Sequence, residues 1–211
     1  MGRLRTHQEW LNATRADQDF GYLNSLRSLY RLHIDNIIPP PHPFRNKIDA
    51  EYGPQNWELV DKQCFSTYSK AQAFQWRSTH GKLYANKHFK AMSIKESSKC
   101  SFCEEESQTL NHLFIDCQTV KNLFACFEKK YDQEKISSLE RLIGFDPEIK
   151  RSKLIMKKLS ILRQIIYKCN HKEEKPRWDH FQDLVDRVYT YEYAIADKNN
   201  RILQHLKIWG K

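Results

Sequence analysis

The sequence predicts a mainly α-helical protein, and three observations carry that prediction. Apolar residues recur at spacings of three and four along most of the 211 residues, which is the period of an amphipathic helix. Only 6 glycines are present, so there are few candidates for hairpin turns. Four of the 7 prolines lie between residues 39 and 43, which leaves the other stretches almost uninterrupted. A chain of this length can bury a sizeable core without disulfides.

The first half of the chain divides at its prolines. Residues 4–33 have the spacing of two helices, so we expect an N-terminal helical pair over residues 1–38. The stretch "IIPPPHPF" removes backbone donors and favours extended backbone, which predicts a Pro-rich linker over residues 39–54. Three further helices are expected at about residues 57–65, 67–80 and 83–92.

The second half contains the most regular helical pattern. Residues 118–130 form one expected helix, and Asp146 with Pro147 supplies a start signal for the next one. Its packing seam consists of Ile155, Leu159, Leu162, Ile166 and Cys169. A basic stripe of Lys150, Lys153, Lys157, Ser160, Gln164 and Lys168 falls on another face, where ordinary solvated surface and phosphate contact are both open readings. A final pair is expected at residues 178–196 and 198–209. We therefore divide the remainder into two predicted segments. Residues 55–132 form a basic helical segment that includes the metal motif described below, and residues 133–211 form a C-terminal helical bundle.

Three cysteines and one histidine have the spacing of a metal site. The stretch "CSFCEEESQTLNHLFIDC" reads C-x2-C-x8-H-x4-C, and its ligands are Cys100, Cys103, His112 and Cys117. Four such ligands close a tetrahedron around zinc and leave no open position for an activated water. We expect one structural zinc and no catalysis at this site. The fold class becomes an irregular helical domain with an embedded CCHC zinc knuckle. The remaining cysteines, Cys64, Cys126 and Cys169, are expected in the core.

Positive charge is concentrated just before this motif. The chain has a formal net charge of +9, and residues 62–99 hold eight Lys or Arg against the single acid Glu96, a net +7. Aromatic residues alternate with these cations, a pattern suited to phosphate contact and base stacking. The simpler reading is that the aromatic rings are core and the lysines are solvated. The candidate nucleic-acid contacts are Lys70, Arg77, Lys82, Lys87, Lys90, Lys95, Lys99, Trp76 and Tyr84.

The stretch from Phe74 to Phe124 resembles the zinc-binding region that follows the polymerase in reverse transcriptases of LINE-type, non-LTR retrotransposons. The matching positions are Phe74, Trp76, His80, Ala85-Asn86, Cys100, Cys103, His112-Leu113-Phe114 and Cys117. Alanine at position 85 departs from the family's common threonine. The similarity extends more weakly over residues 55–211, through "NWELVDKQCF", "IIYKCNHKEEKP", "YEYAIADKNN" and "HLKIWG".

The resemblance implies a zinc-stabilised module that binds RNA or an RNA/DNA hybrid. The chain contains no Asp-Asp pair to hold polymerase metal ions, so we expect no enzyme activity. The alternative is a structural domain that docks on a polymerase core or another protein through surfaces such as the seam. A segment of a larger reverse transcriptase, a host protein derived from one and an inactive relic all fit the resemblance. We expect neither membrane nor small-molecule partners, and an intracellular location in the nucleus or cytoplasm, since no secretory signal or membrane span is apparent.

Overall fold

The computed structural model describes residues 43–62, 69–131 and 133–210. The chain divides after residue 41 into two units, and every described residue lies in the second, residues 42–211. The expected N-terminal helical pair falls outside the described residues.

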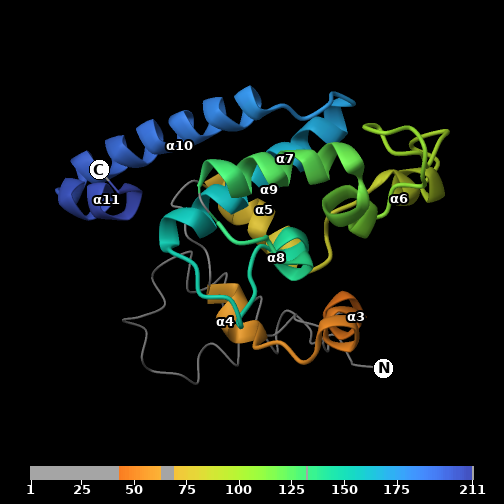
Figure 1. Ribbon diagram of the computed structural model, residues 1–211, viewed down its shortest axis with the longest axis horizontal. Coiled ribbons are helices and arrows are strands. Elements are labelled where there is room, and N and C mark those ends of the chain that lie inside the picture. The colour runs from red at the N-terminus through yellow and green to blue at the C-terminus, as the bar shows by residue number, and fades with distance from the viewer. Residues whose placement is uncertain (1–42, 63–68, 132, 211) are drawn as a thin grey trace, which may run out of the picture. The chain divides into compact units, whose positions relative to one another are not determined.

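The regular elements of the described residues are all helices, as Figure 1 shows. Its elements are α3 (Pro43–Tyr52), α4 (Trp57–Lys62), α5 (Ser69–Thr79), α6 (Asn86–Ala91), the π-helical turn η1 (His112–Asp116), α7 (Gln118–Lys130), α8 (Ser138–Ile143), α9 (Lys153–Lys172), α10 (Trp178–Lys198) and α11 (Ile202–Trp209). Within these residues there is no strand, only an isolated antiparallel bridge between Lys99 and Ser107. The predicted mainly α class with an embedded knuckle is confirmed. None of the described helices is long and apolar enough to cross a membrane.

Helix α9 is the centre of the fold because its whole apolar seam is buried. The five seam residues from Ile155 to Cys169 have exposed fractions between 0% and 7%. Helices α5, α10 and α11 and the turn η1 pack against α9. The seam is therefore covered by this chain's own helices and is not a free docking surface.

The start of α9 corrects the sequence prediction. The helix begins at Lys153, where Ser152 Oγ accepts a hydrogen bond from Ile155 N at 3.3 Å. Asp146 instead forms a local turn, in which its Oδ1 accepts from Glu148 N at 3.1 Å and its Oδ2 accepts from Ser137 Oγ at 2.8 Å. An Asp-Pro step can open a turn as readily as a helix, and the hydrogen bond to Ser137 favours the turn here.

Two short helices were not expected. The predicted Pro-rich linker is wrong from residue 43, since α3 begins there with Pro43 at its first position and buries Ile48. Helix α8 carries a capping box, in which Ser137 Oγ accepts from Glu140 N at 3.1 Å and Glu140 Oε2 accepts from Ser137 N at 2.9 Å. Gly144 ends α8 with a φ of 84°. Both signals are legible in "SSLERLIG", but the helix is too short to show periodicity.

One hydrophobic core joins residues on both sides of the predicted boundary near residue 132. It includes Phe74, Phe124 and Phe127 as well as Leu159 and Phe181. The basic knuckle segment and the C-terminal helices therefore stabilise one another.

A buried arginine holds three helices of this core together. Arg163 on α9 is fully buried and donates to Arg141 O at 2.9 Å, Leu142 O at 2.6 Å and Gln75 Oε1 at 3.1 Å, and also to Ser78 Oγ. Burial lowers the pKa of Arg163 to about 9, so the group is still a cation at neutral pH. No carboxylate among the described residues pairs with it, and carbonyl and hydroxyl oxygens provide its solvation. The end of α8 and the middle of α5 are thereby fixed to α9.

The stripe on the other face of α9 is not uniformly solvated. Lys157 is 4% exposed and forms an ion pair with Glu192 of α10, which is also 4% exposed. Trp209 Nε1 of α11 donates to Glu192 Oε2 at 3.1 Å. The interpretation of the stripe as ordinary solvated surface is wrong for Lys157, because Trp209 of the C-terminal "HLKIWG" packs over its ammonium group.

Candidate metal centre and basic surface

The first two metal ligands lie in a tight turn. Cys100 and Cys103 are held by hydrogen bonds from Glu104 N to Cys100 O and from Cys100 N to Glu106 O, each 2.9 Å long. Glu104 has a φ of 62°, which turns the chain back after Cys103. Phe102, between the two cysteines, is 1% exposed and anchors the turn in the core.

The other two ligands are brought to one side by a wide helical turn. His112 and Cys117 are five residues apart, which on an α-helix would separate their directions by about 140°. In η1 the N–H of Cys117 donates to His112 O at 2.8 Å, an i to i−5 bond that places the two residues one above the other. Cys117 then leaves the turn with ψ 122° and forms the N-cap of α7. Sequence spacing alone gave no sign of this π-helical turn.

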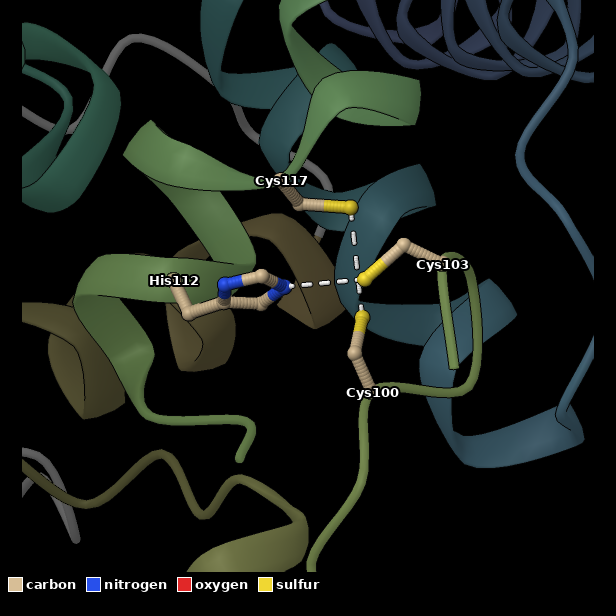
Figure 2. Close-up of side chains that lie close together, drawn as sticks. All are labelled: Cys100, Cys103, His112 and Cys117. Carbon is tan, nitrogen blue, oxygen red and sulfur yellow. Dashed lines mark hydrogen bonds between the residues drawn. The ribbon is translucent and has the colours of Figure 1, made fainter. Parts of the chain in front are cut away.

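The four ligand atoms have the separations that a tetrahedral zinc requires. Figure 2 shows the side chains of Cys100, Cys103, His112 and Cys117 converging, and their ligand atoms all lie within 4.8 Å of one another. Cys100 Sγ is 3.9 Å from Cys117 Sγ, and Cys103 Sγ is 3.4 Å from His112 Nε2. Bonds of about 2.3 Å to sulfur and about 2.0 Å to nitrogen give tetrahedral edges of about 3.8 Å and about 3.5 Å. The residues present fit zinc.

Residues around the ligands hold them in the right chemical form. Glu106 Oε2 lies 2.9 Å from His112 Nδ1, which leaves Nε2 directed at the other ligands. Cys100 Sγ accepts hydrogen bonds from Phe102 N at 3.4 Å and Gln108 Nε2 at 3.3 Å. The contact with Cys117 Sγ, which is the largest cause, and the hydrogen bonds with Cys103 N, Phe102 N and Gln108 lower the pKa of Cys100. The same thiol contact raises the pKa of Cys117. The site therefore favours a thiolate at Cys100.

The contact between Glu106 and His112 yields a prediction. Glu106→Gln is expected to weaken zinc binding by about 10-fold, the lower end for such partners, because the carboxylate is 70% exposed. Competition with a chromogenic chelator measures the change. Glu105→Gln, at the exposed neighbouring position, is the matched control and should bind zinc like the wild type. Equal affinities of the two variants would show that Glu106 does not orient the histidine.

The comparisons with known proteins agree with this geometry. Residues 50–124 match the family model for zinc-binding in reverse transcriptase. All four ligands lie inside the matched segment, so this segment is similar to a reverse-transcriptase zinc-binding domain and the four residues are its candidate zinc site. The resemblance noted in the sequence is confirmed at this level, and its LINE-type assignment stays a prediction. The matched domain is a metal-binding one and not a catalytic one. No curated protein and no solved structure gives a significant match.

Within this segment, the loop that carries the metal ligands is hydrogen-bonded directly to the start of the basic helix α6. Gln108, which is fully buried, accepts from Asn86 N at 3.1 Å through its side chain and from Lys87 N at 3.1 Å through its carbonyl. Asn86 Nδ2 returns hydrogen bonds to Lys99 O at 2.8 Å and Ser101 Oγ at 2.9 Å. Since Ala85 cannot cap the helix, the knuckle supplies the partners of its first N–H groups. Glu106 and Gln108 were missed by sequence reasoning, because polar residues between two ligand pairs look like an ordinary solvated loop.

Most of the candidate nucleic-acid contacts are exposed. The exposed cations are Lys70, Arg77, Lys82, Lys87, Lys90 and Lys99. Trp76 is 48% exposed and stacks on His80 with ring centroids 4.5 Å apart, and Tyr84 is 41% exposed. Lys95 differs from the rest, since its Nζ binds Glu173 Oε1 at 2.7 Å and Asn86 Oδ1 at 3.1 Å. It therefore has a structural role in the fold.

The cysteines outside the motif are less uniform than expected. Cys169 is buried, as predicted, but Cys126 is exposed on α7. Cys126 lies on the face of α7 opposite the core, and Leu123, Phe124 and Phe127 occupy the face that is buried. Cys64 lies outside the described residues.

Proposed function

We propose that the chain is a non-catalytic, zinc-stabilised module that binds RNA or an RNA/DNA hybrid. By this account it corresponds to the C-terminal region of a non-LTR retrotransposon reverse transcriptase, or to a host protein derived from one. The observation that carries the proposal is that the segment matching the reverse-transcriptase zinc-binding family exposes several cations and holds the basic helix α6 against its metal-binding loop. Bound zinc supplies a four-way crosslink between the turn at Cys100 and the helix at Cys117.

The chain's own residues support binding without base-edge readout. Lys87 and Lys90 are exposed on α6, whose first two N–H groups donate to Gln108 of the metal-binding loop. Lysine binds phosphate as a point charge and is indifferent to base identity. Trp76 and Tyr84 offer exposed rings on which bases can stack. We therefore expect affinity that depends on charge and on strand type more than on sequence.

A binding titration tests this function. Labelled RNA, single-stranded DNA and duplex of one sequence are titrated with purified protein at 50 mM and 200 mM salt, and fluorescence anisotropy reports binding. Affinity is expected to fall by a factor of about 10 or more between the two salt concentrations, since several phosphate contacts release counterions. Lys87→Gln with Lys90→Gln should lower both the affinity and its salt dependence. No binding, or a flat salt response, would falsify the proposal.

The alternative of a protein-docking domain has lost the surface that motivated it. The seam from Ile155 to Cys169 is buried by α5, α10, α11 and η1. A change such as Leu162→Asp would now disturb the core and not a partner contact.

A further inference from the structure

A groove opens between α5, α9 and α10, away from the metal ligands. Its volume is about 640 Å³, which is enough for a nucleotide with its base. The lining residues are Lys70, Ala73, Phe74, Arg77, Gln164, Tyr167, Lys168, His171, Lys172, Leu184, Arg187, Val188 and Tyr191. The three helices that form it lie up to about 120 residues apart in the sequence.

The charge of this groove has one sign. Lys70, Arg77, Lys168, Lys172 and Arg187 line it, and none of the lining residues is an acid. Of these five cations, only Lys172 has a carboxylate partner within the described part of the chain. Its Nζ lies 3.8 Å from Glu174 Oε1, and both side chains are exposed. Like charges gathered on facing walls raise the local concentration of an anion. The groove is therefore built for a polyanion.

The spacing of the cations follows the helices. Lys70 and Arg77 are separated by two turns of α5, about 10 Å along the axis, and Lys168 and Lys172 by one turn of α9, about 6 Å. Successive phosphates of an extended strand can therefore meet cations from both walls.

The groove also presents rings and an acceptor. Phe74 and Tyr167 pack with centroids 5.7 Å apart, and Tyr167 packs edge-on against His171 at 4.5 Å. Burial, Lys95 and Arg77 lower the pKa of His171, so at neutral pH it is an uncharged ring. Gln164 Oε1 is buried at the groove with no hydrogen-bond partner in the described part of the chain. This oxygen suits a donor such as a base amino group or a ribose 2′-hydroxyl.

The groove is connected to the metal centre through contacts of Arg163 with two aromatic rings. Phe114, two residues after His112, lies with its ring centroid 5.6 Å from the guanidinium of Arg163. The same guanidinium lies 5.3 Å from the ring of Phe74 in the groove wall. Ordering of η1 by the metal ligands therefore supports the wall on α5.

We propose that this groove binds a single-stranded nucleic-acid segment, with phosphates on the cations of α5, α9 and α10 and a base against the rings. The inference rests on the proposed function and names the surface that performs it. An unpaired strand fits because only an unstacked base can reach Tyr167 and the exposed His171 between the walls. Lys168, Lys172 and Arg187 are then binding residues that the sequence pattern of residues 62–99 did not include.

The test compares two double variants. Lys168→Gln with Arg187→Gln removes two groove cations, and Lys129→Gln with Lys130→Gln removes two exposed cations at the end of α7, outside the groove. The probes are fluorescein-labelled 12-nucleotide oligo-U, oligo-dT and a duplex, and thermal melting by circular dichroism confirms that both variants fold. The groove variant should bind oligo-U at least 10-fold more weakly than the wild type, with a salt slope smaller by about 1.4. The control should stay within 2-fold.

The outcomes separate the two proposals. Wild-type protein that binds none of the probes overturns both. Binding that both double variants retain equally overturns the groove alone and leaves the function with the lysines of α6. Duplex binding as tight as oligo-U and equally sensitive to the groove variant contradicts the single-strand assignment. Loss for oligo-U and oligo-dT alike supports phosphate contacts with the groove cations.

Discussion

Cys103→Ser is expected to release the metal and unfold the knuckle from about residue 95 to residue 120. Apparent binding energies of structural zinc are of order 10 kcal/mol, so loss of one ligand should cost more than the ~1 kcal/mol of an average substitution. Cys103 is the informative position, because it is only half-buried, whereas Cys100 and Cys117 are 1% and 0% exposed. Serine there changes coordination with little change in packing.

The measurement is hydrogen exchange of backbone amides, with and without zinc. In the wild type the amide of Cys117, bonded to His112 O, should be protected only when zinc is present. Cys126→Ser removes an exposed cysteine of α7 and should behave as the wild type does. Protection of η1 in the Cys103→Ser variant equal to that of the control would contradict a role for the metal in ordering this turn.

Arg163→Met is expected to lower the free energy of unfolding by about 3–5 kcal/mol, because several buried acceptors each lose their donor at a cost of about 1–3 kcal/mol. Methionine has a similar length, so the main loss is of the donors to Arg141 O, Leu142 O, Gln75 and Ser78. Carbonyl groups left without partners in the core retain their full desolvation cost. Since Arg163 also lies between Phe74 and Phe114, the groove wall should loosen together with the core.

Urea unfolding followed by circular dichroism gives the free energy. Arg163→Lys should recover little, because one ammonium group cannot reach acceptors that a planar guanidinium reaches with three nitrogens. Arg201→Met, at an exposed position before α11, is the control for loss of a cation and should change stability by less than about 0.5 kcal/mol. A stability of Arg163→Met close to that of this control would mean that the buried network is dispensable.

The sequence predicted those features that depend on local spacing. The ligand set follows from C-x2-C-x8-H-x4-C, and the buried seam of α9 follows from the repeat that begins at Ile155. The start of α9 was misplaced because Asp146 and Ser152 both have capping chemistry, and only the contact of Asp146 with Ser137 distinguishes them.

Features that depend on distant segments could not be predicted from the sequence. The periodic pattern of α9 places Lys157 on the polar face of the helix. The burial of Lys157 depends on Glu192 and Trp209, which are more than 30 residues away in the sequence. The groove is a further case, since Lys70 and Arg187 meet only when α5 and α10 pack beside α9. Periodicity identifies the face of a helix that is polar, but not the helix that will lie opposite.

The zinc content of the purified chain tests the central claim most directly. Elemental analysis by mass spectrometry, with protein concentration from amino-acid analysis, should find one zinc per chain in the wild type and in Cys126→Ser. Cys103→Ser should retain far less than one. A wild-type chain that folds with no stoichiometric zinc would contradict the claim that Cys100, Cys103, His112 and Cys117 form a closed structural site.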